Sequence, residues 1–422
     1  MSEYDVAVIG AGPAGLAAVQ NLDKFECSVL LIDQGRSIFE RDKDLESELT
    51  QGHGGAGLYS DGKFSFFPSA SNLWNLPRSK DLRAAYDWTC NLLKSYGLDT
   101  PPYPSNPEDY AVGAGEWVLK AYPSDYLSLQ ARIELIGQLV SHLSADIATE
   151  TQVHSYLYNK DDDRFELILE GASNERYTVK AKRLIIASGR FGPLWKALDV
   201  PRSFQRLEVG FRIEQPHERS FFNGMTQLDP KLKLQSEDGN VEWRTFCACR
   251  NGETVFTETQ QLWTVSGHSD GPASGKSNVG FNTRILDEKL AINAIESVIV
   301  AMRDKHSYFR VSLQDALQGN TDAIDALDKV YGKKLREIML LGVQKLIGKF
   351  PSIDHSQTRL IGPTLEGVGW YPCVDGNLRM PDIPAWVAGD ACGLFRGIVA
   401  AFISGHYAAD SVINELVSKG RA

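Results

Sequence analysis

The chain has 422 residues, of which 43% are apolar and 23% charged, values typical of a soluble globular enzyme with a large core. The net charge of −10 argues against a general polyanion binder. The six cysteines are scattered, so we expect reduced thiols, and Cys247-x-Cys249 has no partner at metal spacing, so we expect no bound metal. No run of 18 apolar residues exists, and the first predicted strand leaves no room for a signal peptide. These features predict a cytoplasmic protein with no membrane span.

The first elements form a β-α-β unit over residues 4–33. A buried strand, Tyr4–Ile9, runs into the turn Gly10-Ala11-Gly12-Pro13-Ala14-Gly15, a helix follows, and a second strand ends at Asp33. In a G-x-G-x-x-G turn the glycines allow a tight turn, close approach of a pyrophosphate, and close packing of helix on strand. The helix N terminus favours phosphate, and the acid accepts hydrogen bonds from ribose. The unit predicts a dinucleotide site.

The middle of the chain alternates loops, helices and a hairpin. Residues 37–80 are rich in glycine, with Gly52–Gly57 and Ser60–Lys63 at their centre, which indicates close approach to a ligand. Helices are predicted over 81–97 and 126–144, separated by a loop. Strands at 152–160 and 164–170 form a hairpin, and a third at 177–182 leads into the apolar run 183–189.

The second half predicts a different unit. Residues 205–283 are rich in strands with polar connections, which favours an antiparallel sheet, and long helices follow at about 286–304 and 321–349. A strand at 383–388 ends at Gly389-Asp390, and the last helix covers about 397–417. We therefore expect a nucleotide-binding domain built from 1–204 and 351–422, with a substrate domain, 205–350, inserted between them.

The dinucleotide is expected to be FAD. A reductase that also holds a nicotinamide dinucleotide needs a second G-x-G-x-x-G unit, and residues 184–192 do not supply one. We expect the Gly52–Lys63 loop to lie under a flavin ring. Val153 begins a strand that could present backbone groups to adenine, and the helix after Gly389-Asp390 could face the flavin.

These motifs resemble the glutathione-reductase-type FAD superfamily. Gly54-Gly55-Ala56-Gly57 with Ser60-Asp61-Gly62-Lys63 resembles the GGAGxxSDGK loop of a group of bacterial FAD-dependent dehydrogenases, as do segments 209–214, 249–253 and 389–398. The resemblance implies an α/β fold: a Rossmann-like FAD-binding domain with three layers, ββα, and an inserted substrate domain of antiparallel sheet and helices. Asp33 stands where Glu is common and Ser188 where Thr is usual.

Together the motifs and the resemblance give a set of expected FAD-binding residues: Gly10, Gly12, Pro13, Ala14, Gly15, Asp33, Gln34, Arg36, Gly54, Gly55, Gly57, Ser60, Lys63, Val153, Ser188, Gly189, Gly389, Asp390, Arg396, Gly397 and Ile398. For the reaction itself the candidates are Arg212, Arg250, Glu253, His268 and His53. Arginines clamp carboxylates, and a histidine acts as a general base, but a structural ion pair or a loop histidine explains each of them as well.

We expect an FAD-dependent dehydrogenase or oxidase that takes hydride from a small or medium polar substrate onto flavin N5. An alternative is an amine-oxidising lyase that cleaves a C–N bond, for example trimming an amino acid from a modified thymine in phage DNA. That version would give an anionic partner to the basic helix side of Lys333, Lys334, Arg336, Lys345 and Lys349, although a solvated face is the simpler explanation. A non-catalytic flavin-binding or RNA-modification accessory protein is a third possibility.

Overall fold

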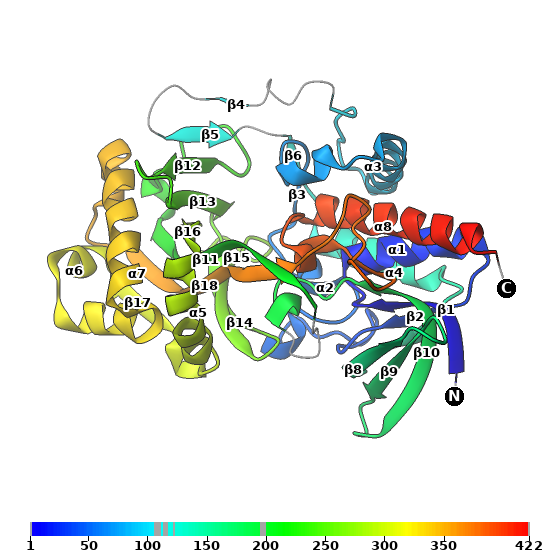
Figure 1. The fold of residues 1–422 in the computed structure, drawn as a ribbon. Coiled ribbons are helices and arrows are strands. Elements are labelled where there is room, and N and C mark those ends of the chain that lie inside the picture. Colours follow the sequence, from blue (N-terminus) through cyan, green and yellow to red (C-terminus); the bar gives the residue numbers. More distant parts are fainter. Residues whose placement is uncertain (1, 105–110, 113–116, 121–122, 195–199, 421–422) are drawn as a thin grey trace.

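Two β-sheets organise the protein in the computed structural model, which describes residues 2–104, 111–112, 117–120, 123–194 and 200–420 (Figure 1). The first sheet has seven strands. In spatial order they are β7 (Asp146–Ala148), β2 (Val29–Ile32), β1 (Ser2–Ile9), β10 (Arg176–Ile186), β9 (Arg164–Glu170) and β8 (Gln152–Asn159), with β19 (Ala385–Val387) beside β10.

The first sheet combines a parallel core with an antiparallel extension. The pairs β1–β2, β2–β7, β1–β10 and β10–β19 are parallel, whereas β10–β9 and β9–β8 are antiparallel. The predicted hairpin is confirmed, and the predicted strand 177–182 continues through 186 as one long strand, β10, so that only the first four residues of the predicted run 183–189 belong to it. Because β1, β10 and β19 run parallel, their carboxyl ends, followed by Gly10, Ala187 and Ala388, lie at one edge.

Helices cover one side of this parallel core. They are α1 (Pro13–Leu22), α3 (Ser79–Lys94), α4 (Leu129–Ser141) and α8 (Ile398–Ser418), with the short α2 (Gly55–Leu58). Helix α8 lies along α1 (Figure 1), and a Cβ at Gly405 would lie 1.9 Å from the carbonyl oxygen of Ala14, so a larger residue there would separate the two helices. The predicted helices over 81–97, 126–144 and 397–417 are confirmed within a few residues.

The second sheet has eight strands, and every pairing between them is antiparallel. In spatial order they are β17 (Phe309–Ser312), β18 (Arg359–Pro372), β11 (Arg202–Pro216), β16 (Lys276–Ile285), β13 (Val241–Cys249), β12 (Lys231–Gln235), β5 (Val118–Lys120) and β4 (Ala111–Val112). Two smaller ladders join β14 (Glu253–Thr259) to β15 (Leu262–His268) and β3 (Lys63–Ser65) to β6 (Ser124–Tyr126).

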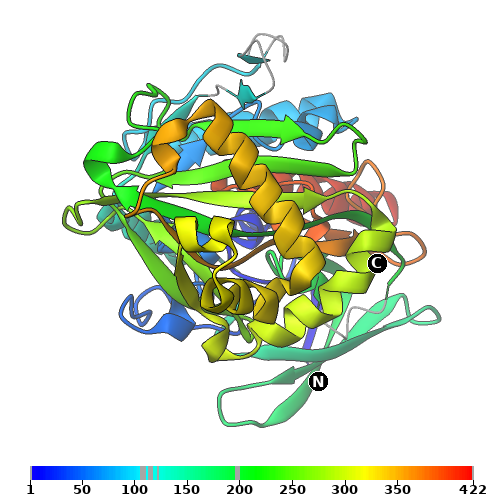
Figure 2. The ribbon, with the colours of Figure 1, turned by 90° about the vertical axis from the view of Figure 1, so that its left-hand side faces the viewer.

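The faces of the second sheet differ in chemistry. On β11 the odd-numbered Leu207, Val209, Phe211 and Ile213 are buried in one apolar cluster with α5 (Glu288–Met302), α6 (Leu313–Gln318) and α7 (Thr321–Lys349). Figure 2 shows these helices in front of the sheet. The first sheet has its own buried cluster, so the described part of the chain forms two cores.

One predicted helix needs correction. Helix α7 spans the predicted range 321–349, but Gly332 has φ 68° and ψ 161°, so two helical segments meet there at a kink. Glycine adopts positive φ without the steric penalty of other residues, which explains the position of the break.

The two sheets mix segments from the three predicted domain ranges. Strand β18 comes from 351–422, and β4 and β5 come from 1–204, yet all three lie in the second sheet. The sheets confirm the predicted α/β class with an antiparallel unit, while the domain boundaries stay a prediction. Among the described residues, no helix is long and apolar enough to cross a membrane.

Candidate functional site: a glycine cradle facing a polar sheet

The glycine turn after β1 contains two glycines that the fold itself requires. Gly10 has φ +101°, and a Cβ there would lie 2.4 Å from the carbonyl oxygen of Ala187. A Cβ at Gly15 would lie 1.8 Å from the carbonyl oxygen of Gly10. Gly12 is different, because its Cβ would meet nothing closer than the Cα of Gly55 at 3.9 Å. Protein packing therefore does not explain Gly12, whereas a ligand held against the turn does.

Three chain segments meet at this turn. The amide of Gly54 donates to the carbonyl of Ala11 at 2.8 Å, and a Cβ at Gly57 would lie 3.1 Å from Cγ1 of Ile398. Pro13 and Ile398 are the first residues of α1 and α8, and neither helix has a side-chain cap at its N terminus. The free N–H groups of both helix ends favour a negatively charged ligand such as a pyrophosphate.

Asp33 organises the turn as well as ending β2. Its Oδ2 accepts from the amide of Ala11 at 2.7 Å, and its Oδ1 accepts from Gly35 at 2.8 Å and Gly52 at 2.9 Å. Sequence reasoning expected a ribose contact, and it missed these backbone bonds. The ribose contact stays a prediction, since a carboxylate offers about four acceptor positions and three are used.

The residues expected to surround the adenosine end lie near Asp33. The amide of Thr151 donates to the carbonyl of Asp33 at 2.9 Å, so the start of β8 with Val153 is tied to the end of β2. Arg36 pairs with Glu48 at 3.0 Å and Glu150 at 3.4 Å, and the side chain of Gln34 donates to Gln51.

We call the turn 10–15, the loop 52–57 and the start of α8 the glycine cradle. The segment that follows β10, beside this cradle, contains a buried polar atom without a partner among the described residues. The Oγ of Ser188, after β10, is buried with no hydrogen-bond partner among the described residues. Gly189 follows with φ +74°, and the amide of Gly389 donates to Ser404 Oγ at 2.9 Å. The open space at Gly12, the uncapped helix ends and the Ser188 hydroxyl fit a dinucleotide cofactor.

Two residues of the glycine-rich loop have other contacts than expected. Ser60 Oγ donates to the carbonyl of Gly57 at 2.8 Å. The ammonium of Lys63 lies 3.0 Å from Asp61 and donates to the carbonyl of Ala248 in β13. Lys63 therefore joins the loop to the second sheet, and its expected contact with the cofactor remains untested.

The second sheet presents a polar, buried face. The even-numbered residues of β11 include Glu208, Arg212 and Glu214, and those of β16 include Asn278, Asn282 and Arg284. Glu208 is 0% exposed, and Arg212 and Asn282 are each 1% exposed. Contacts from this sheet reach the cradle segments: Arg206 donates to the carbonyl of Gly393 and Gln205 to that of Cys392, at 2.6 and 3.0 Å.

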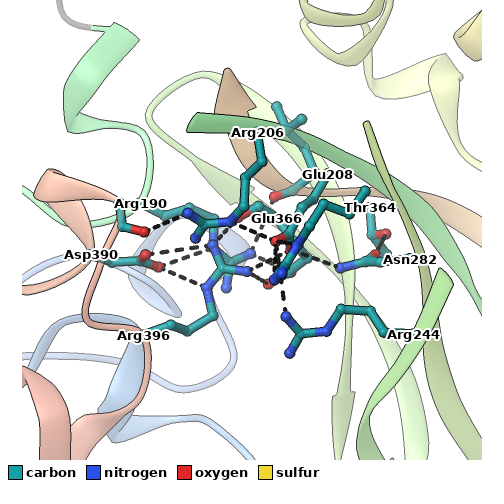
Figure 3. A network of polar contacts seen from close by, with 12 residues as sticks. Arg190, Arg206, Glu208, Arg244, Asn282, Thr364, Glu366, Asp390 and Arg396 are labelled. Atoms are coloured by element: carbon teal, nitrogen blue, oxygen red, sulfur yellow. Dashed lines mark hydrogen bonds and ion pairs between the residues drawn. The ribbon is translucent and has the colours of Figure 1, made fainter. Parts of the chain in front are cut away.

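Glu208 is the centre of a charged network on this face (Figure 3). Its carboxylate lies 2.6 Å from Arg284, 2.7 Å from Arg206 and 3.2 Å from Arg396, with Arg244 at 3.9 Å. Burial raises the pKa of Glu208, but the arginines, led by Arg284 and Arg396, outweigh it and hold the pKa well below its ordinary value. Glu208 is therefore a carboxylate at neutral pH.

The network extends to the segment between β19 and α8. Arg396 pairs with Asp390 at 3.2 Å and with Glu366 at 3.1 Å, and Arg190 pairs with Glu366 at 2.6 Å. Sequence reasoning proposed Asp390 and Arg396 as cofactor contacts; the structure gives both a role in joining the sheets. Five arginines, namely 190, 206, 244, 284 and 396, face the three carboxylates of Glu208, Glu366 and Asp390.

Of the five candidate catalytic residues, the structure brings Arg212 and His268 together: a Cβ at Gly267 would lie 2.3 Å from Nη2 of Arg212, and the charge of Arg212 acts on His268. Arg212 is buried, donates to Asn278 and Cys247, and lies on the polar face. Arg250 instead donates to four backbone carbonyls, those of Phe222, Met225, Gln227 and Leu228, and so holds the 222–228 loop. Glu253 is exposed at the start of β14, opposite His268 in the ladder.

The two candidate histidines, His53 and His268, are both neutral at pH 7. Burial lowers the pKa of His53, whose Nδ1 accepts from the amide of Ile38 at 3.2 Å while its Nε2 is buried without a partner among the described residues. Burial also lowers the pKa of His268, whose Nε2 lies 3.2 Å from Ser266 Oγ. A catalytic role for these five residues stays a prediction.

Residues 4–208 match the family model described as "Pyridine nucleotide-disulphide oxidoreductase", a family of FAD-binding flavoproteins. This segment is an FAD-binding domain. Sequence reasoning identified the cofactor correctly, and the narrower resemblance to dehydrogenases with a GGAGxxSDGK loop stays a prediction.

Individual similar proteins are distant. An uncharacterized protein of Clostridium beijerinckii is 24% identical over 284 residues, covering 61% of this chain and 47% of the relative, so the chain spans about half the length of that curated protein. A geranylgeranyl bacteriochlorophyll reductase-like protein of Thermoplasma acidophilum has a TM-score of 0.45 at 14% identity, over 99% of this chain and 80% of the other. A flavoprotein/dehydrogenase of Cytophaga hutchinsonii has a TM-score of 0.46 at 12% identity, over 99% and 79%.

Two glycines of the FAD-binding domain should respond in opposite ways to an added methyl group. In G12A the Cβ has free space and φ is −72°, so the cost of alanine at this N-cap is partly offset by the lower entropy of the unfolded chain. The free energy of unfolding of the FAD-free protein should change by no more than about 1 kcal/mol. The methyl group should obstruct the pyrophosphate and raise the FAD dissociation constant at least tenfold, about 1.4 kcal/mol. G15A should instead destabilise the fold by about 3 kcal/mol, because of the clash with Gly10. Denaturant unfolding and FAD titration of both variants distinguish these effects; unchanged FAD affinity in G12A would contradict the assignment.

Removing the charge of Glu208 should destabilise the protein in a pH-dependent way. E208Q leaves several buried arginines without their carboxylate and should lower the free energy of unfolding by about 3 kcal/mol at pH 7. Because folding lowers the pKa of Glu208, its contribution is present above the unfolded value of about 4.3 and is lost as the pH falls below it. Thermal unfolding from pH 3 to 8 should show the difference shrinking in acid. E296Q, on the exposed side of α5, is the control and should match the wild type at every pH.

Proposed function

We propose that this chain is an FAD-dependent oxidoreductase that transfers a hydride from a small or medium polar substrate to flavin N5. The observation that carries the proposal is the buried polar face of the second sheet, which contacts the same segments that form the glycine cradle. Lys63 bonds to the carbonyl of Ala248, and Arg396 pairs with Glu208. When bound, FAD supplies a two-electron acceptor, and the protein has to orient the substrate and exclude water.

The charge of this face supports a substrate that carries a carboxylate. Arg284 also pairs with Glu242 at 2.9 Å, and Glu242 with Lys233. The Glu208 network therefore has five arginines and one lysine against four carboxylates, an excess of two positive charges. Arg244 has the loosest contact, because its nearest carboxylate oxygen lies 3.9 Å away and its side chain is 22% exposed. A guanidinium group binds a carboxylate through two parallel hydrogen bonds, so Arg244 is our choice for the residue that clamps the substrate anion.

The N terminus of α8, which follows Arg396 of this network, also supports placing the reaction beside the polar face. Gly397 precedes it with φ +107° and no side-chain cap, and a Cβ there would meet nothing within 4 Å. Its uncapped N–H groups favour negative charge that develops close to that helix end.

Anaerobic titration of the FAD-loaded protein tests the proposal. Amino acids, hydroxy acids, their neutral amide or ester analogues and reduced nicotinamides are added singly, and flavin absorbance is followed. We expect bleaching by an anionic substrate, with the concentration for half-bleaching raised at least tenfold in R244M. The matched control is R303M, at an exposed arginine that follows α5. Failure to take up FAD would overturn the proposal, and equal bleaching by neutral analogues would overturn the role of Arg244.

The products distinguish simple oxidation from the alternative lyase reaction. A dehydrogenase or oxidase gives only the oxidised substrate, with peroxide formed in air by an oxidase. An amine-oxidising lyase would release an oxo acid such as glyoxylate from an aminoacyl-modified thymine. DNA binding at moderate salt would favour that reaction and would involve the basic residues of α7, of which Lys333, Lys334 and Lys349 are exposed while Arg336 pairs with Asp328 at 2.7 Å.

A further inference from the structure

Two cysteines at the end of β13 lie side by side in the polar face. The backbone is irregular here, since the register with β16 shifts between Phe246 and Cys249, and Cys247 has φ +48°. A positive φ in a non-glycine residue is strained and often marks a functional position. The two Sγ atoms are 4.0 Å apart, and Cys249 is 0% exposed.

Charged groups from two other segments, the glycine-rich loop and β11, surround this pair. The thiol of Cys247 donates to Asp61 Oδ2 at 3.0 Å, and Lys63 lies 3.0 Å from the same carboxylate. On the other side, Nη2 of Arg212 lies 3.7 Å from Cys249 Sγ. Gly267 makes room for Arg212, because a Cβ there would lie 2.3 Å from Nη2.

The charges balance when Cys249 is a thiolate. Lys63 and Arg212 contribute two positive charges and Asp61 one negative charge, and the next acid, Asp229, has its own partner in Lys231 at 3.2 Å. Ligand atoms of Asp61, Cys247 and Cys249 lie within 4.8 Å of one another, near enough for a metal ion. A metal would place further positive charge beside two buried cations, so a thiolate is the better completion of the cluster.

We propose that Cys247 and Cys249 form a two-cysteine redox centre in which Cys249 reacts with a hydroperoxide and Cys247 closes the disulfide. Neither residue lies in the segment 4–208 that matches the FAD-binding family model. Because Cys249 is fully covered, the oxidant has to be close to water in size, as hydrogen peroxide is.

The chemistry balances in two steps. The thiolate of Cys249 attacks one peroxide oxygen, the O–O bond breaks, and the sulfur is oxidised to a sulfenic acid. The other oxygen leaves as hydroxide and takes up from solvent the proton that Cys249 released on ionisation, which gives the first water. Cys247 then attacks Cys249 Sγ, the S–O bond breaks, and the proton of Cys247 passes through Asp61 to the leaving hydroxide. One dithiol and one peroxide give one disulfide and two waters.

The acidities of the two thiols agree with these roles. The single S–H proton of Cys247 lies between Asp61 and Cys249. When it turns toward Cys249, its hydrogen bond, together with the charges of Lys63 and Arg212, outweighs burial and lowers the pKa of Cys249 to about 7. The same sulfur–sulfur hydrogen bond, burial and Asp61 raise the pKa of Cys247 well above its ordinary value. A low-pKa thiol beside a neutral one is the arrangement of an attacking and a resolving cysteine.

Peptide mass spectrometry of the FAD-loaded protein provides the test. Cleavage after Arg244 and Arg250 gives the peptide 245–250, which contains both cysteines and no other. After a short exposure to hydrogen peroxide, the protein is unfolded in the presence of an alkylating reagent, because Cys90 and Cys392 are buried. We expect the peptide to have lost two hydrogens, while Cys27, Cys90, Cys373 and Cys392 are alkylated. In C247S, dimedone present during unfolding should trap a sulfenic acid at Cys249; C249S should give neither product, and the control C373S should behave as the wild type.

A pH profile separates a chemical role of Lys63 from a structural one. In wild type the oxidation rate should rise with pH to a plateau with a midpoint near 7. K63M should lower the rate at pH 7 at least tenfold and move the midpoint upward. The control K289M, which removes an exposed lysine of α5, should leave both unchanged. Full alkylation of peptide 245–250 after peroxide treatment would overturn the proposal. So would one zinc per chain in the purified wild type that is absent from C247S.

Discussion

The buried carboxylate of Glu208 is the interaction on which the arrangement of the two sheets depends. It belongs to β11, the strand between β18 and β16, and its partners come from β11, β16, β13 and the segment before α8. A carboxylate that is 0% exposed has to be compensated by neighbouring charges, because water cannot reach it. The position of Arg396, and with it the start of α8, therefore follows from a residue about 190 positions earlier in the chain.

At the cofactor end, Asp33 has a similar function on a smaller scale. Its carboxylate fixes the amides of Ala11, Gly35 and Gly52, which belong to the glycine turn, the end of β2 and the glycine-rich loop. Asp33 therefore holds these three backbone segments in place before any ligand binds. Preorganisation of this kind lowers the entropy that is lost on binding. Asp33 thus has a structural role in addition to the predicted contact with ribose.

The local patterns of the sequence predicted most of the fold. The β-α-β unit, the hairpin and the last helix depend on periodicity and turn residues within 30 residues, and all are present. Strand β18 was missed, since Pro363 and three glycines interrupt an apolar run whose partner, β11, lies about 150 residues away. The break in α7 was missed because Gly332 lies within an otherwise regular helical pattern.

In the candidate site, too, local motifs were predictable and contacts between distant parts of the chain were not. The glycines of the cradle were predicted from one motif, because their spacing has a geometric cause. Lys63 was expected at the cofactor, and its contacts with Asp61 and Ala248 could not be foreseen, since Ala248 lies 185 residues further on. One signal for the polar face was present in the sequence: in 207–214, charged residues occupy even positions of an apolar strand, which places Glu208, Arg212 and Glu214 on one face.

The energetics of that face favour a chemical role for it. Burying an ion pair contributes little net stability, and replacement by well-packed apolar residues is often neutral or stabilising. The opposite face of the same strand is apolar and packs well against α5 and α7, so this backbone accepts an apolar surface. Stability alone would therefore allow apolar residues on both faces. We therefore interpret the arginines and carboxylates between the sheet and the FAD-binding domain through the polar substrate that we propose, whose own hydrogen-bonding groups the site has to match.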